Sequence, residues 1–147
     1  MFLCYFLSMT QSFSPDTLKA LTSQALNQQV EMGLSEGALA LMRAGMALKE
    51  IQRRRDYPTT FEAYVSDEFG MTRSRAYQLI YAADIIADLV DAFPVKNLPR
   101  SDSAVLPMMT LSKEQRIEVW RVALEGAKRS PGQGTVKRLV KELYGAA

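Results

Sequence analysis

The sequence has no histidine and only one cysteine, Cys4, in its 147 residues. A single cysteine excludes an internal disulfide, and the lack of histidine removes a common metal ligand and the usual general base near neutral pH. No paired carboxylates stand in a setting that would separate their pKa values. No glycine-rich segment matches a phosphate-binding loop, and PGQGT at residues 131–135 is typical of a helix-helix connection. We therefore expect that the protein is not an enzyme and that it binds neither a metal ion nor a cofactor.

Long apolar runs are also missing. The first seven residues, MFLCYFL, are apolar, but the run is too short to span a membrane and has no basic flank of the kind that begins a signal peptide. We expect a cytoplasmic protein that does not enter a membrane. Met9, followed by Thr10 and Gln11, would also suit a translation start, so residues 1–8 are either a start-site extension or a functional element.

The formal net charge is only +2, but the charges are unevenly distributed. Residues 43–55 contain five basic side chains against Glu50, and residues 112–147 contain eight against four acidic ones. Between them, residues 56–91 carry seven acidic side chains against Arg73 and Arg75. Any extended basic surface must therefore be assembled from several segments.

Two-residue alternation of the kind that indicates a half-buried strand is not convincing anywhere, whereas apolar residues recur at helical spacing throughout. We expect an all-α protein, a bundle of about six helices. Ser14 and Pro15 are the predicted N-cap and first residue of a helix that runs to about Met32. Its narrow apolar stripe either pairs with a second copy of the chain or lies on the body of the protein. The stripe comprises Leu18, Leu21, Ala25 and Met32.

Gly33 is predicted to end that helix and Ser35 to open the next, which ends in an arginine run at positions 53–55. The run suits the negative end of the helix dipole and is either a solvated basic end or a phosphate clamp. The apolar side of this helix comprises Leu39, Met42, Met46, Ala47 and Ile51.

Residues 59–89 have the pattern of a helix-turn-helix, the motif that delivers the N-terminus of its second helix into the DNA major groove. Thr59 and Glu62 are the predicted capping box of the first helix, Gly70 supplies the positive φ that ends it, and Thr72 caps the second. Met71 is expected to fill the corner. The apolar side of the second helix, predicted from Arg73 to Val90, comprises Ala76, Leu79, Ile80, Ala83, Ile86, Ala87 and Val90.

Polar and aromatic residues opposite that apolar side suit the reading of base edges over the first two or three turns. The predicted DNA-contacting residues of this helix are Thr72, Arg73, Ser74, Arg75, Tyr77, Gln78 and Tyr81. The predicted phosphate contacts are Arg53, Arg54, Arg55, Lys137, Arg138 and Lys141. Asp84, Asp88 and Asp91 lie beyond the midpoint of the helix, where they would repel phosphates.

Two alternatives remain open for the same residues. The segment could be an ordinary helical hairpin whose Tyr77 and Tyr81 pack on a neighbour. The acidic face formed by Asp84, Asp88 and Asp91 could instead bind a basic protein partner, as an accessory factor would.

The remaining segments are predicted to support this motif. Pro94 and Pro99 interrupt the chain, and Ser101 caps a short helix that ends near Met109. Ser112 and Gln115 form a capping box on a long helix with Trp120 in the core. A last helix opens at Ser130 or Thr135, with Val136, Leu139, Val140 and Leu143 inward and Lys137, Arg138 and Lys141 outward.

Residues 61–86, FEAYVSDEFGMTRSRAYQLIYAADII, lie between ALKEIQRRRDYPTT and the later segments AVLPMMTLSKEQRIEVWRVALEGA and TVKRLVKEL. Together they resemble the helical DNA-binding region of ParB- and KorB-type partition proteins, and more closely their small relatives on plasmids, phages and other mobile elements. In that family a glycine, a hydrophobic residue, Ser or Thr and a short polar run before Tyr open the recognition helix. The matching positions are Gly70, Met71, Thr72, residues 73–76 and Tyr77.

The resemblance covers about residues 39–143 and is most specific at 70–80. It does not extend to the nucleotide-hydrolysing domain of full partition proteins, so we carry over no nucleotide binding. It implies a sequence-specific DNA-binding protein, a homodimer on double-stranded DNA, that regulates transcription, replication or partition of a mobile element. Residues 1–34 are then an arm and helix that could dimerise, and residues 35–147 are the DNA-binding domain with its supporting helices.

Overall fold

The computed structural model describes residues 15–33 and 37–145, and every regular element within these ranges is a helix. The predicted all-α class is therefore confirmed, with eight α-helices in the described residues where about six were expected. The expectations for residues 1–8, Ser14 and Ser35 lie outside the described ranges. In order, the elements are α2 (Pro15–Lys19), α3 (Ser23–Gly33), α4 (Ala38–Arg54), α5 (Phe61–Phe69), α6 (Arg73–Val90), η1 (Val95–Asn97), α7 (Asp102–Val105), η2 (Leu106–Met108), α8 (Lys113–Gly126) and α9 (Gln133–Tyr144).

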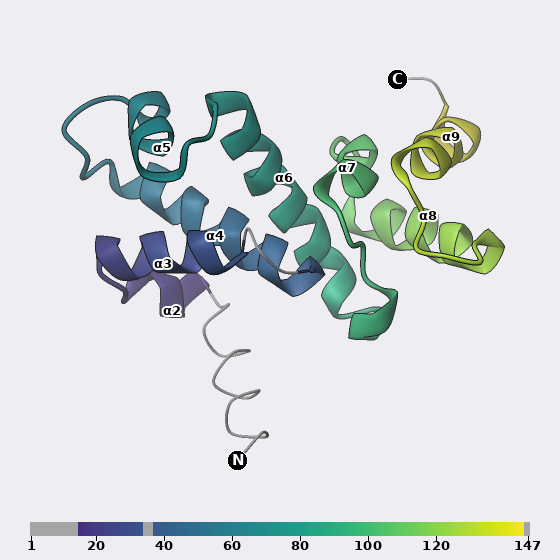
Figure 1. Ribbon diagram of the computed structural model, residues 1–147. Helices are drawn as coiled ribbons and strands as arrows, with labels where there is room; N and C mark the ends of the chain where they lie inside the picture. Colours follow the sequence, from purple (N-terminus) through teal and green to yellow (C-terminus); the bar gives the residue numbers. More distant parts are fainter. Residues whose placement is uncertain (1–14, 34–36, 146–147) are drawn as a thin grey trace, which may run out of the picture.

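Helix α6 runs through the middle of the molecule, with α3, α4 and α5 on one side and α7, α8 and α9 on the other (Figure 1). Helices on both sides bury more of α6 than one apolar stripe could account for. Ala82, Ile85 and Leu89 are fully buried although they lie outside the predicted stripe, whereas Ala87 is exposed. The predicted stripe was thus too narrow, because a helix covered on two sides needs apolar residues on both.

The crossing of α4 and α6 is close because Gly45 has no side chain. A Cβ atom at this position would meet the carbonyl oxygen of Leu79 at 2.2 Å and the Cβ of Ala83 at 2.4 Å. The two backbones are therefore almost in contact. This crossing places the C-terminal end of α4 beside the first turns of α6.

Residues 15–33 form two helices where one was predicted. Residues 20–22 interrupt the helix. The hydroxyl of Thr22 accepts a hydrogen bond from the Ala25 amide at 3.2 Å, which caps α3. The break changes which residues face inward: Leu26 and Val30 are fully buried, and Leu21 and Ala25 only partly. Within the single chain this face lies on α4, while self-association of the segment stays a prediction.

Local capping signals fixed several helix ends as expected. Ser101 caps α7, and the Ser112–Gln115 capping box is complete at the start of α8. Trp120 is fully buried, and its indole Nε1–H donates to the Asn97 carbonyl oxygen at 2.8 Å. These three expectations are confirmed.

Three local predictions were wrong. Thr60, not Thr59, caps α5 by accepting from the Ala63 amide at 3.1 Å, so no capping box with Glu62 forms. The two threonines offer the same hydroxyl, and Thr60 is the one that directly precedes the first helical residue, the buried Phe61. Helix α9 begins at Gln133 after Gly132, not at Ser130 or Thr135. Leu143 in its last turn is 44% exposed rather than inward.

Candidate nucleic-acid interface

Helices α5 and α6 are joined by a three-residue corner, residues 70–72. Gly70 adopts φ 64°, in the left-handed region that ends a helix, and its amide donates to the Ser66 carbonyl oxygen. The side chain of Met71 is buried in the corner. The hydroxyl of Thr72 accepts from the Arg75 amide at 3.1 Å. The corner predicted from the sequence is therefore present, and it gives α6 a sharply defined first turn.

The first two turns of α6 present an exposed polar and aromatic face. Arg73, Ser74, Gln78 and Tyr81 are exposed, and a shallow depression is lined by Arg73, Ser74, Tyr77 and Tyr81. The Arg73 guanidinium lies 5.3 Å from the centre of the Tyr77 ring, whose centre is 6.1 Å from that of Tyr81. Stacking of this kind holds the long arginine side chain over the helix surface.

Tyr77 is partly buried, unlike its neighbours on this face. Its hydroxyl accepts a hydrogen bond from Gln52 of α4, and its ring packs edge-on against Phe61 of α5 with centres 5.8 Å apart. The side chain thus joins three helices. In the structure Tyr77 therefore packs on neighbouring helices, as the alternative of an ordinary helical hairpin predicted, and it supports the exposed face of α6.

Arg75 also has an intramolecular partner. Its guanidinium forms an ion pair with Asp102 in the first turn of α7, and the Asp102 side chain is only 14% exposed. This contact joins α6 to the C-terminal helices. We therefore assign Arg75 to positioning α6, not to direct contact with a ligand.

The three arginines at the end of α4 differ in their exposure and in their partners. Arg54 is mostly buried, pairs with Glu50, and donates to the carbonyl oxygens of Leu18 at 3.1 Å and Lys19 at 2.9 Å. It therefore ties α2 to α4. Arg53 pairs with Glu50 at 2.6 Å but is 59% exposed, and Arg55 is exposed without an ion pair to any described residue.

Glu50 is a buried carboxylate held by these arginines. The hydrogen bond from Arg53, together with that from Arg54, lowers the pKa of Glu50 to about 2, against the opposing effect of burial. The side chain therefore stays ionised at neutral pH. Arg53 and Arg54, two of the three predicted phosphate contacts in this run, therefore form ion pairs with one internal carboxylate, which offsets part of their positive charge.

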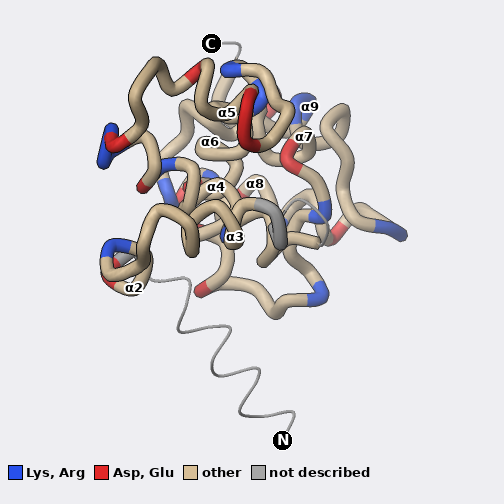
Figure 2. Tube along the Cα trace, turned by 60° about the vertical axis from the view of Figure 1, so that its left-hand side comes forward, with Lys and Arg blue, Asp and Glu red and all other residues tan. Residues whose placement is uncertain are grey.

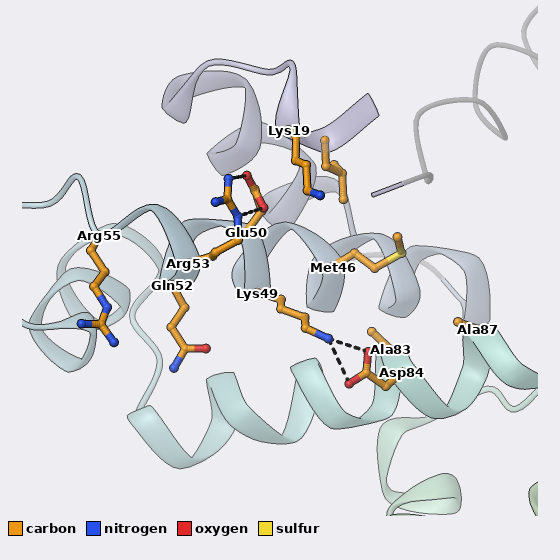
Figure 3. Close-up of a pocket in the computed structure, with 11 residues that line it drawn as sticks. Lys19, Met46, Lys49, Glu50, Gln52, Arg53, Arg55, Ala83, Asp84 and Ala87 are labelled. Atoms are coloured by element: carbon orange, nitrogen blue, oxygen red, sulfur yellow. Dashed lines mark hydrogen bonds and ion pairs between the residues drawn. The ribbon is translucent and has the colours of Figure 1, made fainter. Parts of the chain in front are cut away.

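A groove of about 790 Å³ lies between α2, α4 and α6 (Figure 3). Four basic side chains line it, but Glu50 pairs with Arg53 and Asp84 pairs with Lys49 at 3.3 Å. Its floor is apolar, with Met46 and Ala83 among the residues drawn. Arg43, counted among the basic residues of this helix, is buried and adds nothing to the surface.

Asp84 and Asp88 in the second half of α6, and Asp91 at its C-cap, all have basic partners on flanking helices. Asp84 pairs with Lys49 of α4, Asp88 with Arg116 of α8 at 2.8 Å, and Asp91 with Lys113 of α8 at 3.8 Å. The Asp88 pair is the closest and least exposed of the three, whereas the Asp91 side chain is 79% exposed. These pairs offset part of the negative charge, and the partners of Asp84 and Asp88 lie 35 and 28 residues away along the chain.

The basic side chains of α9 lie apart from the α5–α6 corner. Lys137, Arg138 and Lys141 are exposed, and Arg138 pairs with Glu142 at 3.8 Å. Helix α7 stands between α9 and the first turn of α6 in Figure 1. Figure 2 shows lysine and arginine spread over many segments of the chain rather than along one stretch. The arginine run at the end of α4 and the basic residues of α9 therefore lie on opposite sides of α6.

Sequence reasoning missed two side chains that shape this region, Gln52 and Asp102. Both act through partners more than twenty residues away, Tyr77 and Arg75, so no local spacing reveals them. In the part of the chain that the structure describes, no three metal-binding side chains come together. No helix in those residues is long and apolar enough to cross a membrane. No protein-family model, curated protein or solved structure matches this sequence.

Proposed function

We propose that the protein binds double-stranded DNA, with α5, the corner and α6 acting as a helix-turn-helix. The observation that carries this proposal is the exposed face of the first two turns of α6, formed by Arg73, Ser74, Gln78 and Tyr81. Further along α6 its apolar residues pack against α4, α7 and α8, and the exposed Asp84 is paired with Lys49. The N-terminal turns therefore carry the polar face that such a motif inserts into the major groove.

The residue types on this face suit direct readout. The Gln78 amide matches the donor and acceptor pattern of adenine in the major groove, and Arg73 matches guanine. Thr72 and Ser74, at the positive end of the helix dipole, suit a backbone phosphate. Arg55 is the residue of the arginine run whose charge is available for a phosphate contact, since Arg53 pairs with Glu50 and Arg54 is bound internally.

Ion pairing in the second half of α6 also favours this function. Asp84, Asp88 and Asp91 would repel DNA if they were free, but each has a basic partner. The same pairs weigh against the alternative of an acidic face that binds a basic protein. The resemblance to partition proteins supports a wider role as a homodimeric, sequence-specific regulator of transcription, replication or partition on a mobile element.

The test is selection of bound duplexes from a random pool at low salt, with the molar mass of the protein measured by light scattering on the same sample. We expect enrichment of a palindromic sequence by a dimer. Gln78→Ala should relax the choice of base at one position in each half-site, by roughly 1–3 kcal/mol of discrimination. Gln28→Ala, at an exposed glutamine of α3, is the matched control and should select the wild-type sequence. If the wild-type protein enriches no duplex at low salt, the proposal fails.

A further inference from the structure

A second basic surface lies away from the α5–α6 corner, where the loop before α7 meets the end of α8. It is a pocket of about 330 Å³. Two segments some thirty residues apart in sequence form it, residues 96–100 and 124–130. Its lining comprises Lys96, Asn97, Leu98, Arg100, Leu124, Ala127, Lys128, Arg129 and Ser130.

Four of the lining residues are cationic and none is acidic. Lys96, Arg100, Lys128 and Arg129 are exposed, and none of them forms an ion pair with another described residue. The groove beside α4 differs in this respect, because Glu50 and Asp84 offset part of its charge. Four cations around one hollow repel each other, and no carboxylate among the lining residues offsets this repulsion.

One wall of the pocket is held in place by buried contacts, and the other is continuous with α8. The Trp120 indole donates to the Asn97 carbonyl oxygen at 2.8 Å, which fixes the first segment on α8. Leu98 and Pro99, which belong to the same segment, are buried. The second segment begins in the last turn of α8 and continues past its end, where the Ala127 amide donates to the Leu124 carbonyl oxygen at 3.3 Å. Lys96 and Arg100 therefore project from an anchored piece of main chain, and Lys128 and Arg129 from the residues that follow the end of α8, so that ordering of the first segment costs little when a ligand binds.

We propose that this pocket binds a phosphate group. Arginine offers a planar pair of N–H donors that matches phosphate, lysine offers a compact charge, and Asn97 and Ser130 add neutral donors. The phosphate could belong to a nucleic-acid backbone or to a small phosphorylated molecule, since the chemistry of recognition is the same. The proposal does not depend on the DNA-binding role of α6, which uses other residues.

The first experiment titrates the full chain with inorganic pyrophosphate while amide resonances are followed by NMR, with sodium chloride at equal ionic strength as the reference. We expect saturable shifts at the amides of residues 96–98, of Arg100 and of residues 127–130, since Pro99 has no amide proton. The double variant Lys128→Gln/Arg129→Gln should weaken pyrophosphate binding about tenfold or more. Lys96→Gln/Arg100→Gln removes the same charge from the other wall and should have a similar effect.

The matched control is Lys113→Gln/Arg121→Gln, which removes two exposed charges from α8 outside the pocket. It should leave pyrophosphate binding unchanged. If the control weakens binding as much as the pocket variants do, or if no saturable shift occurs at the pocket amides, the proposal is overturned.

A duplex titration over a range of salt concentrations identifies the source of the phosphate. If the pocket holds a DNA phosphate, Lys128→Gln/Arg129→Gln lowers the salt slope of duplex binding by about 0.9 for each phosphate that the variant no longer neutralises. If it holds a small phosphorylated molecule, the duplex slope is unchanged while pyrophosphate binding falls. Failure of α6 to bind DNA would leave the pyrophosphate result intact, so the two proposals fail separately.

Discussion

Gly45 of α4 lies directly against the Leu79 carbonyl of α6, with no room for a Cβ atom between them. This contact sets how closely the two longest helices of the described residues approach. It also brings Gln52 of α4 to Tyr77 of α6, and Lys49 of α4 to Asp84 of α6. The orientation of the candidate reading face therefore depends on a residue with no side chain.

Gly45→Ala should destabilise the protein. Helix propensity favours alanine by up to about 1 kcal/mol, but forcing the two backbones apart costs more, so we expect a net loss of roughly 1–3 kcal/mol. Urea denaturation followed by circular dichroism measures it. Gly134→Ala is the control, because a Cβ there meets nothing within 4 Å in the first turn of α9, and it should be neutral or slightly stabilising. Equal stability of Gly45→Ala and wild type would contradict the close crossing.

Glu50 should make the stability of the protein depend on pH in the acid range. Its pKa falls from 4.5 to about 2 on folding, chiefly through the hydrogen bond from Arg53. A depressed pKa contributes stability that is fully present above about pH 4.5 and is lost as the pH falls towards 2, here roughly 1–3 kcal/mol after allowance for the solvent around Arg53.

Replacing Glu50 by glutamine should therefore flatten the free energy of unfolding between pH 4.5 and pH 2. Denaturation curves at several pH values, for wild type and Glu50→Gln, give the comparison. Glu125→Gln, at an exposed glutamate of α8, should keep the wild-type pH dependence. Identical pH profiles for wild type and Glu50→Gln would rule out the contribution assigned to this carboxylate.

Arg54 and Arg55 are neighbours with different expected roles. The sequence alone predicts that Arg54→Ala weakens binding to all DNA sequences alike, whereas the structure commits this side chain to Glu50 and to two carbonyl oxygens of α2. We expect Arg54→Ala to cost roughly 2–4 kcal/mol of stability, because it leaves buried partners unsatisfied. Thermal and urea denaturation measure this loss.

Arg55→Ala should leave stability within about 0.5 kcal/mol of wild type, since the side chain is exposed. If Arg55 contacts a phosphate, as proposed, duplex affinity falls for every sequence and the salt slope decreases by about 0.9. Fluorescence anisotropy at several salt concentrations gives both values. The reverse pattern, with Arg55→Ala unstable and Arg54→Ala stable, would show that the two roles are assigned wrongly.

The ion pair between Arg75 and Asp102 should couple α6 to α7. In a double-mutant cycle with Arg75→Ala and Asp102→Ala, we expect an interaction free energy of about 1 kcal/mol, limited by the 41% exposure of the Arg75 side chain. Strictly additive effects on unfolding would mean that the pair contributes no stability. The exposed pair Arg121–Glu118 is the comparison and should show a smaller coupling.

The amino-acid sequence by itself determined the helical class and several helix ends, because these depend on residues within a few positions of one another. Gly70 and Thr72 specify the corner before α6 through a positive φ and a hydroxyl cap, and Ser112 with Gln115 closes the start of α8 in the same local way. Where two equivalent local signals were adjacent, as at Thr59 and Thr60, sequence alone chose wrongly.

Tertiary structure decided which charged side chains are free. Asp88, Arg75 and Arg54 each find a partner more than twenty-five residues away, and no periodic pattern encodes such a pair. It also assembled the pocket of Lys96, Arg100, Lys128 and Arg129 from two segments that carry no shared motif. Charge along a chain is a local property, whereas its neutralisation depends on which helices pack together, and that is settled only when the core around α6 forms.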